Sequence, residues 1–243
     1  MLSEKPWKPE AVVLLGAGLL MSMGLGALTL SAWRQLMPGQ TEAQLQFVGL
    51  IVSAVSFHGM ALIFVHQFLG LHGVGWRGFL GLDRPGAGRL AVLALVAAVV
   101  IVPLALGLNR LCAELLVALG QNPVEQEPVK IIQVSAGWGP RTCSAVAAVV
   151  LAPLAEESMF RGILYPLLRP RAGRAAALWL TSLLFALIHF NVMTFVPLLG
   201  LSIVLTLLYE RTDALLVPVL THAGFNVVNF SLLVLDTDAA PWT

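Results

Sequence analysis

The sequence predicts an all-α membrane protein, a polytopic bundle of about seven transmembrane helices with the functional site inside the last four. Of its 243 residues, 58% are hydrophobic and 11% are charged, whereas soluble domains carry about 25% charged residues. The mean hydropathy is +0.87. The apolar residues form long runs, and the 14 basic residues fall in short clusters between them. With a formal net charge of +1 and no basic surface, no nucleic-acid partner is expected.

The first three predicted spans are runs without Asp, Glu, Lys or Arg, each about as long as the ~20 residues that a helix needs to cross ~30 Å of hydrocarbon. They cover residues 11–33, 45–71 and 90–109. The second run contains His58 and His66, which lie about two helical turns apart, and we interpret both as packing residues. The third contains a proline, which a membrane helix tolerates as a kink.

The later spans are less regular. Residues 110–141 combine an amphipathic piece, a Pro- and Glu-containing piece and an apolar piece, so we expect a partly interfacial or re-entrant connection. The fourth predicted span, residues 142–160, carries two glutamates near its end. Residues 175–209 are free of formal charge and too long for one crossing, and the polar stretch 189–194 divides them into a fifth and a sixth span. The seventh span covers residues 214–235.

The basic residues predict the orientation, because cytoplasmic loops carry an excess of Lys and Arg. With the N-terminus inside, ten basic residues lie on the cytoplasmic side and four lie outside. The ten are Lys5, Lys8, Arg77, Arg84, Arg89, Arg161, Arg169, Arg171, Arg174 and Arg211, and the four are Arg34, Arg110, Lys130 and Arg141. The Ala-, Leu-, Gly- and Arg-rich composition indicates a high-GC bacterium. We therefore expect an integral protein of the bacterial inner membrane with a cytoplasmic N-terminus.

Two adjacent carboxylates make the fourth span a candidate for function. Glu156 and Glu157 follow residues 142–155, which carry no charge, and Arg161 comes shortly after. An ionised side chain in or near hydrocarbon is costly unless it is paired, hydrogen-bonded or facing a wet cavity. In a helix, Glu157 and Arg161 are four residues apart and can pair, whereas Glu156 points about 100° away. The alternative is an interfacial helix end whose charges face water.

The last spans add polar groups at helical spacing. His189 ends the fifth span four residues after Phe185, and His222 lies in the seventh span with Asn226 at i+4 on the same face. A single His or Asn inside a membrane is most often an interhelical hydrogen-bond partner. Together with the glutamates, however, these residues supply the groups needed to activate a water molecule or to bind a metal ion.

Three short sequence motifs together resemble the motifs of a known protein family. EESMFR, FALIH and HAGFN match the patterns EExxxR, FxxxH and HxxxN in order, each on a separate apolar segment. Residues 143–230 therefore resemble the CPBP family of intramembrane proteases, which includes the CAAX prenyl endopeptidases and bacteriocin-immunity-type membrane proteins. The resemblance implies one integral membrane domain, residues 1–243, in which residues 11–109 form accessory spans and residues 142–235 form the catalytic core.

The resemblance also implies roles for the matched residues. Glu156 would be the general base that activates water, with His189 assisting it. His222 and Asn226 would stabilise the oxyanion of the tetrahedral intermediate. The residues implied to support the site are Glu157, Arg161 and Phe185.

Other protease chemistries lack their motifs, since the sequence has no HExxH, no GxSG and no GxGD. Zinc remains an alternative cofactor, with Glu156, His189 and His222 as its ligands. We expect that no cofactor is required, because an asparagine is a poor zinc ligand and the two histidines come from separate helices. An amide and an imidazole suit an oxyanion site directly.

The predicted function is that of an intramembrane endopeptidase, metalloprotease-like in its residues, that uses Glu/His-activated water. Its partners would be the lipid bilayer and a membrane-anchored or transmembrane protein or peptide, cut near its C-terminus as in protein sorting. The alternative is a non-enzymatic membrane binding or immunity protein, or a small-solute transporter, that uses the same buried polar residues. The complete set of motif residues disfavours this alternative, because a scaffold does not need all of them.

Overall fold

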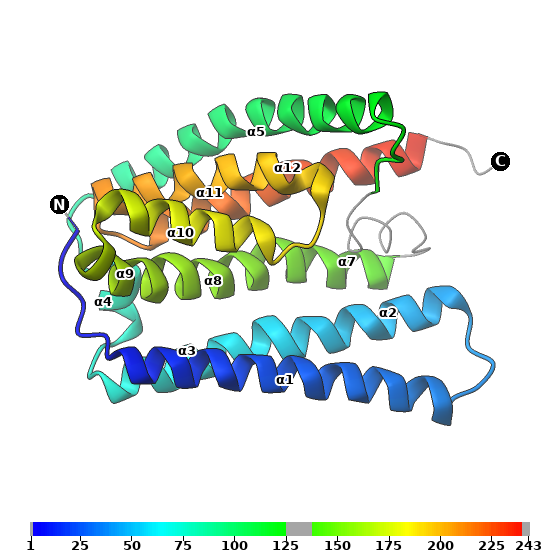
Figure 1. Ribbon diagram of the computed structural model, residues 1–243, viewed down its shortest axis with the longest axis horizontal. Helices are drawn as coiled ribbons and strands as arrows, with labels where there is room; N and C mark the ends of the chain where they lie inside the picture. The colour runs from blue at the N-terminus through cyan, green and yellow to red at the C-terminus, as the bar shows by residue number, and fades with distance from the viewer. Residues whose placement is uncertain (1, 125–137, 240–243) are drawn as a thin grey trace.

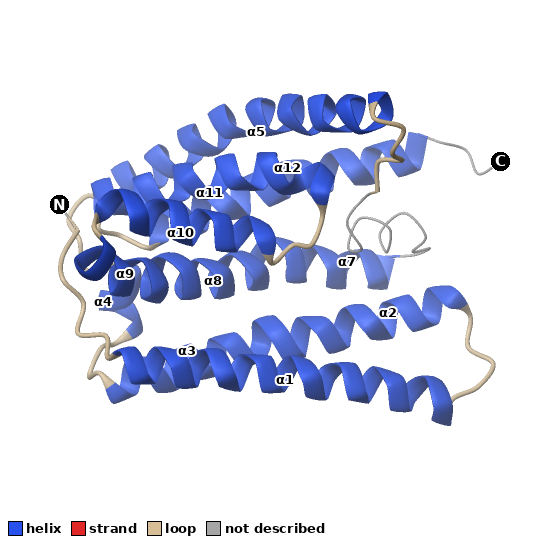
Figure 2. Ribbon diagram, in the orientation of Figure 1, coloured by secondary structure: helices blue, strands red, loops and turns tan. Residues whose placement is uncertain are grey.

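The computed structural model describes residues 2–124 and 138–239, and in these ranges it contains helices, turns and loops but no strands (Figure 2). The long helices lie roughly along one axis, and the two termini are at opposite ends of it (Figure 1). Six helical runs in the described ranges are long and apolar enough to cross a membrane, and a seventh apolar helix is shorter. The chain is therefore a polytopic helical membrane protein, as the sequence predicts.

The first two runs form an N-terminal hairpin. The first is α1 (Pro9–Leu36), and the second is continuous through α2 (Glu42–Ser53), η1 (Ala54–Gly59) and α3 (Met60–Leu71). Both contain the predicted spans. The second run begins with a capping box, in which the Thr41 side chain accepts a hydrogen bond from the Gln44 backbone and the Gln44 side chain accepts one from the Thr41 backbone.

After the short α4 (Trp76–Leu80), the chain enters α5 (Ala87–Ala118), which packs along the last two helices. This helix contains the predicted span 90–109 and continues beyond it. Our expectation of a re-entrant connection is thus wrong for residues 110–118, because these residues extend α5 as regular helix. The rest of that expectation falls largely on residues 125–137, which lie outside the described residues.

The next helical run extends from residue 138 to residue 172 and is 35 residues long. It is built from α7 (Trp138–Val146), η2 (Ala147–Leu151), α8 (Ala152–Glu157), η3 (Ser158–Leu164) and α9 (Tyr165–Ala172). The predicted span 142–160 placed the two glutamates near its end, but the structure places them in the middle of a longer run. The run can continue past the glutamates because side chains inside the bundle pair with their charges.

The predicted break within residues 175–209 is confirmed. The chain turns between α10 (Arg174–Leu187) and α11 (Val192–Thr212), where the Asn191 side chain caps α11 by accepting a hydrogen bond from the Thr194 backbone. The last helix is α12 (Leu216–Ala239). With 14 residues, α10 is only about 21 Å long. Its C-terminal end therefore stops short of the end of the molecule that α5 and α12 reach (Figure 1).

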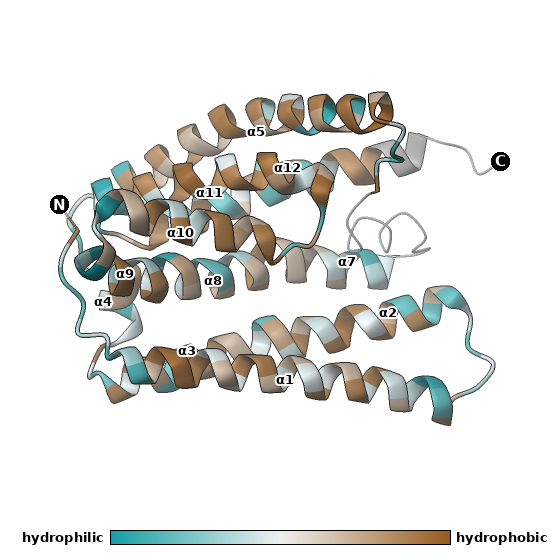
Figure 3. Ribbon diagram, in the orientation of Figure 1, coloured by the Kyte–Doolittle hydropathy of each residue, from teal (hydrophilic) through white to brown (hydrophobic). Residues whose placement is uncertain are grey.

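Polar residues concentrate at the ends of the molecule, and hydrophobic residues dominate between them (Figure 3). The end that holds the N-terminus also holds α9, the α9–α10 turn and the α11–α12 turn (Figure 1), and thus most of the basic residues that we assigned to the cytoplasmic side. Arg161 is a correction to that assignment, because its side chain is fully buried in the bundle. Without it, nine basic residues remain on the predicted cytoplasmic side against four outside.

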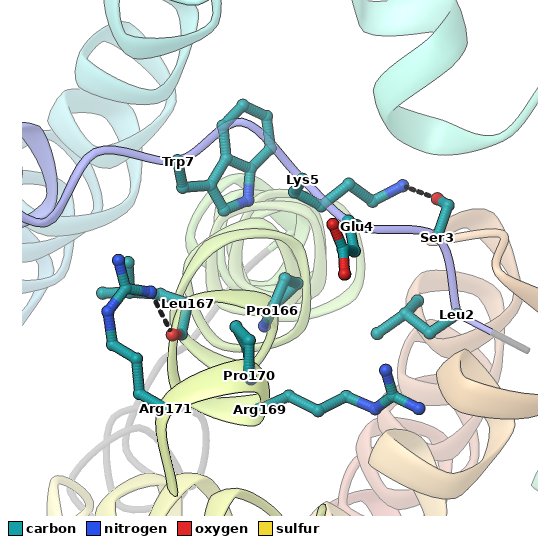
Figure 4. Close-up of a pocket in the computed structure, with 10 residues that line it drawn as sticks. All are labelled: Leu2, Ser3, Glu4, Lys5, Trp7, Pro166, Leu167, Arg169, Pro170 and Arg171. Carbon is teal, nitrogen blue, oxygen red and sulfur yellow. Dashed lines mark hydrogen bonds between the residues drawn. The ribbon is translucent and has the colours of Figure 1, made fainter. Parts of the chain in front are cut away.

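The N-terminal segment, residues 2–8, lies across the end of α9, with a pocket between them (Figure 4). Trp7 is buried, and its Nε1 donates a hydrogen bond of 2.9 Å to the carbonyl oxygen of Gly162. Pro166, four positions after Gly162, has no N–H to donate to this carbonyl. The Trp7 bond attaches the N-terminal segment to the helical run that carries the glutamates.

Asp213, in the turn between α11 and α12, joins three segments. Its carboxylate accepts hydrogen bonds from Ser3 Oγ at 3.1 Å and from Lys5 Nζ at 3.3 Å, and it forms an ion pair with Arg84. Burial raises the pKa of Asp213, but the Ser3 hydrogen bond and the positive charges of Lys5 and Arg84 outweigh that effect. The pKa of Asp213 therefore lies below its usual value of 3.8.

We expect Asp213→Asn to lower the free energy of unfolding at pH 7 by about 1–3 kcal/mol, because the two cations lose their charged partner. Asn tolerates the left-handed backbone at this position (φ 49°), so the substitution tests the charge alone. A depressed pKa stabilises the fold above the unfolded-state pKa, and this stabilisation is lost as the pH falls through the folded-state pKa. The difference in melting temperature between the wild type and Asp213→Asn in detergent should therefore shrink below about pH 4.

The matched control for this prediction is Asp83→Asn. Asp83 pairs with Arg77, but both side chains are largely exposed, and such pairs contribute little to stability. Equal effects of the two substitutions at pH 7 would contradict the importance of the Asp213 cluster.

Candidate active site

The structure buries the charged residues that the sequence singled out. Glu156 and His222 are 6% and 4% exposed, and Glu157 and Arg161 are 0% exposed. Glu156 and Glu157 are the last two residues of α8, Arg161 lies in η3, and His222 lies on α12. The alternative of a helix end whose charges face water is therefore wrong.

Arg161 is surrounded by acceptors. Its Nη1 donates to Glu157 Oε1 at 2.9 Å, as the i, i+4 spacing predicts, and its Nη2 donates to the carbonyl and hydroxyl oxygens of Ser202 at 3.0 and 2.6 Å. Its Nε donates to Thr206 Oγ1 at 3.3 Å. The guanidinium carbon also lies 4.6 Å from the ring centroid of Phe185, a cation–π distance. Arg161 thus connects η3 to both α11 and α10.

Glu157 accepts hydrogen bonds from two side chains. One is from Arg161, and the other is from Nδ1 of His222, which lies 2.9 Å from Glu157 Oε1. A carboxylate can only accept, so Nδ1 of His222 carries a proton and the Nε2 of His222 is the nitrogen left for another partner. Two donors hold Glu157 in place, which suits a structural role better than proton transfer.

Glu156 has a different environment. Its Oε1 lies 3.4 Å from Nε2 of His58, on η1 of the N-terminal hairpin. Its Oε2 is buried and has no hydrogen-bond partner among the described residues. The imidazoles of His58, His189 and His222 all lie near enough to interact electrostatically with this carboxylate. A buried carboxylate oxygen without a protein donor can accept a hydrogen bond from water. Glu157 Oε2 is likewise without a partner among the described residues, but Glu157 is held by two donors at 2.9 Å, so Glu156 is the less constrained carboxylate.

His189 lies directly after the end of α10, at the depth where the short helix stops. Its Nδ1 donates a hydrogen bond of 2.7 Å to the carbonyl oxygen of Phe185, which fixes the tautomer and leaves the Nε2 lone pair available when the ring is neutral. The ring of Phe185 packs against His189 and His222 with centroid distances of 5.0 and 5.9 Å. Phe185 thus positions both imidazoles.

Asn226 bonds to the central helical run ahead of Glu156. Its Nδ2 donates a hydrogen bond of 2.7 Å to the carbonyl oxygen of Ala148, two helical turns before Glu156. In η2 the N–H of Ala152 bonds to the carbonyl five residues earlier, so the next residue, Pro153, would be the donor to Ala148 but has no N–H. Asn226 replaces this donor. Its amide has a second N–H, and no hydrogen bond in the described part of the chain joins it to Glu156, His189 or His222.

His58 is the site residue that the sequence analysis missed. We interpreted it as a packing residue, but it contacts Glu156. It lies in one of three π-helical segments in the described ranges, and the other two hold Ala148 and Arg161. π-Helical turns are rare and frequently occur at functional sites. The only signal in the sequence was a histidine within a long apolar run.

The arrangement does not fit a preformed zinc site. No group of three or more His, Cys, Asp or Glu side chains within residues 2–124 and 138–239 is arranged to hold a metal ion. The Nδ1 atoms of His189 and His222 both donate to protein acceptors, which leaves Nε2 of each ring as the nitrogen that could bind a metal ion. A site made by Glu156, His189 and His222 would require these side chains to move together.

We expect Arg161→Ala to destabilise the protein by about 3–5 kcal/mol, because it leaves Glu157 as a buried, uncompensated charge. The measurements are yield and melting temperature in detergent. Glu156→Gln is the matched comparison, since it changes the neighbouring carboxylate but leaves the Arg161 network intact, and it should melt close to the wild type. Equal losses in both variants would contradict the division between Glu156 and Glu157.

Comparison with known proteins identifies the family of part of the chain. Residues 138–228 match the family model described as type II CAAX prenyl endopeptidase Rce1-like. This range contains all three motifs but not His58. No significant match was found among curated proteins or among solved structures. Residues 138–228 thus form an Rce1-like domain of the CPBP family, a family of intramembrane peptidases.

Proposed function

We propose that the protein is an intramembrane endopeptidase that hydrolyses a peptide bond near the C-terminus of a membrane-anchored protein or peptide. The observation that carries the proposal is the difference between the two glutamates. Arg161 and His222 both donate to Glu157 Oε1 at 2.9 Å, whereas the one hydrogen-bond contact of Glu156 among the described residues is His58 at 3.4 Å. The Oε2 atom of each glutamate is buried without a partner in these residues. Glu157 is thus held by two close donors, which suits support, and Glu156 has only one long contact, which suits reaction with water.

In the proposed mechanism, Glu156 Oε2 accepts a proton from water as the oxygen of that water attacks the scissile carbonyl carbon. The Nε2 of His189 accepts a hydrogen bond from the same water and orients it. A general base of this kind contributes about 10²–10⁴-fold in rate. The proton is then passed from Glu156 to the leaving amine nitrogen as the C–N bond breaks.

The oxyanion of the tetrahedral intermediate would face α12. His222 can donate through Nε2 when its ring is protonated beside Glu157, and Asn226 can donate through its second amide hydrogen. Each such donor contributes on the order of 10²–10³-fold in rate. We propose that no metal ion is required for these steps.

The position of the site supports a membrane-bound substrate. Glu156, Glu157 and Arg161 lie near the middle of a helical run that is apolar enough to cross a membrane, a depth that suits a substrate anchored in the lipid. We propose the bacterial inner membrane and a cytoplasmic N-terminus, because most basic residues lie at the N-terminal end of the bundle (Figure 1).

We expect Glu156→Gln and His189→Ala to abolish processing of the substrate by at least about 10²-fold while leaving a folded protein. The test compares the membrane proteomes of cells that produce the wild type or Glu156→Gln and looks for a protein whose C-terminal processing disappears. The control is Glu114→Gln, which alters an exposed glutamate paired with Arg110. Identical proteomes, with Glu156→Gln folded and expressed, would favour the non-enzymatic alternative.

We also expect purified protein to contain far less than one zinc ion per chain and to keep its activity after chelation and dialysis. Elemental analysis and an activity assay with the processed substrate measure both properties. Stoichiometric zinc that is lost in His189→Ala and His222→Ala, with activity restored by added metal, would reverse this expectation.

A further inference from the structure

His58 brings the N-terminal hairpin into the site. It lies outside the range that matches the Rce1-like family, yet its Nε2 is 3.4 Å from Glu156 Oε1. We infer that His58 is a positioning residue for the peptidase reaction, which holds Glu156 by its Oε1 so that Oε2 faces the water to be activated. This inference rests on the proposed function.

The chemistry of the contact fixes the direction of the hydrogen bond. An ionised carboxylate has no proton to give, so Nε2 of His58 is the donor and Glu156 Oε1 the acceptor. The two side chains are 19% and 8% exposed, so water competes little for this bond. The distance is at the long end for a hydrogen bond, and such contacts often shorten only when substrate is bound.

The geometry separates the two oxygens of Glu156. With Oε1 held by His58, the carboxylate cannot exchange its two oxygens by rotation without breaking this bond. Oε2, which has no partner among the described residues, is then the oxygen left for water, in a carboxylate with which the imidazoles of His189 and His222 interact electrostatically. The ring of Phe57 packs edge-on against His58, with a centroid distance of 4.9 Å, and limits the movement of the imidazole.

His66 lies on the same helical run as His58 but outside the site, so its surroundings can be compared with those of His58. It is exposed and accepts a hydrogen bond of 3.1 Å from Nε1 of Trp76. His58, by contrast, faces a buried carboxylate, and its own Nδ1 is buried without a partner in the described structure. A residue that served only to fill space would not need to bring these polar atoms into the bundle, because burying them is costly.

The test uses three variants of the full-length protein. His58→Phe keeps an aromatic ring but removes the donor, and His58→Gln restores an N–H near the position of Nε2. His66→Phe is the matched control on the same run. The assay is cleavage of the substrate found by the proteomic comparison, with kcat and KM measured separately.

We expect His58→Phe to lower kcat by about 10- to 100-fold, as for the loss of a hydrogen bond to a charged group, with little change in KM. His58→Gln should recover most of this loss, and His66→Phe should behave as the wild type. Full activity of His58→Phe would overturn the inference. So would equal impairment of the Phe and Gln variants together with a lower melting temperature, since this pattern indicates packing alone.

A second measurement does not depend on activity. In protein with ¹⁵N-labelled histidine rings, the His58 signals are assigned by their absence in His58→Gln and then compared between the wild type and Glu156→Gln. A shift of these signals supports the His58–Glu156 bond, and unchanged signals overturn it. If the signals shift but the wild type cleaves no membrane protein, the pairing stands and the proposed peptidase function fails.

Discussion

The ion pair between Glu157 and Arg161 is the interaction on which the arrangement of the site depends. A guanidinium inside a membrane bundle must have its donors satisfied from several sides. Arg161 obtains acceptors from its own helix and from Ser202 and Thr206 on α11, and Glu157 in turn accepts from His222 on α12. The need to compensate one buried cation thus brings three helices together at one depth, and Glu156 is carried to the same depth as the adjacent residue.

Prolines within the central helical run create a second set of connections. Each removes a donor from the helix, and side chains from distant segments bond to two carbonyl groups near these prolines. Asn226 bonds to the carbonyl of Ala148, and Trp7 bonds to that of Gly162. Gly162 is required at its position, because a Cβ there would lie 2.3 Å from a ring atom of Phe79. The run is therefore fixed to α12 on one side of the glutamates and to the N-terminal segment on the other.

The sequence predicted those features that depend on local spacing or on long apolar runs. The spans, the break before α11 and the Glu157–Arg161 pair follow from uncharged length and from the i, i+4 rule. The depth of Glu156 did not follow, because a helix that contains charges looks as if it ends at them when their partners are on other helices. His58 was missed for a related reason. Its contact joins residues 98 positions apart, and a π-helical turn shifts the face on which it lies.

The shortness of α10 has a consequence for the surrounding lipid. Several of its large apolar side chains are exposed, among them Trp179, Leu183 and Leu187, yet the helix spans only about 21 Å against ~30 Å of hydrocarbon. Such a hydrophobic mismatch is relieved by local thinning of the bilayer, at a cost of fractions of a kcal/mol per Å. A bilayer thinned in this way is thinnest beside α10, so headgroup water approaches the bundle most closely at the end of this helix, which His189 follows.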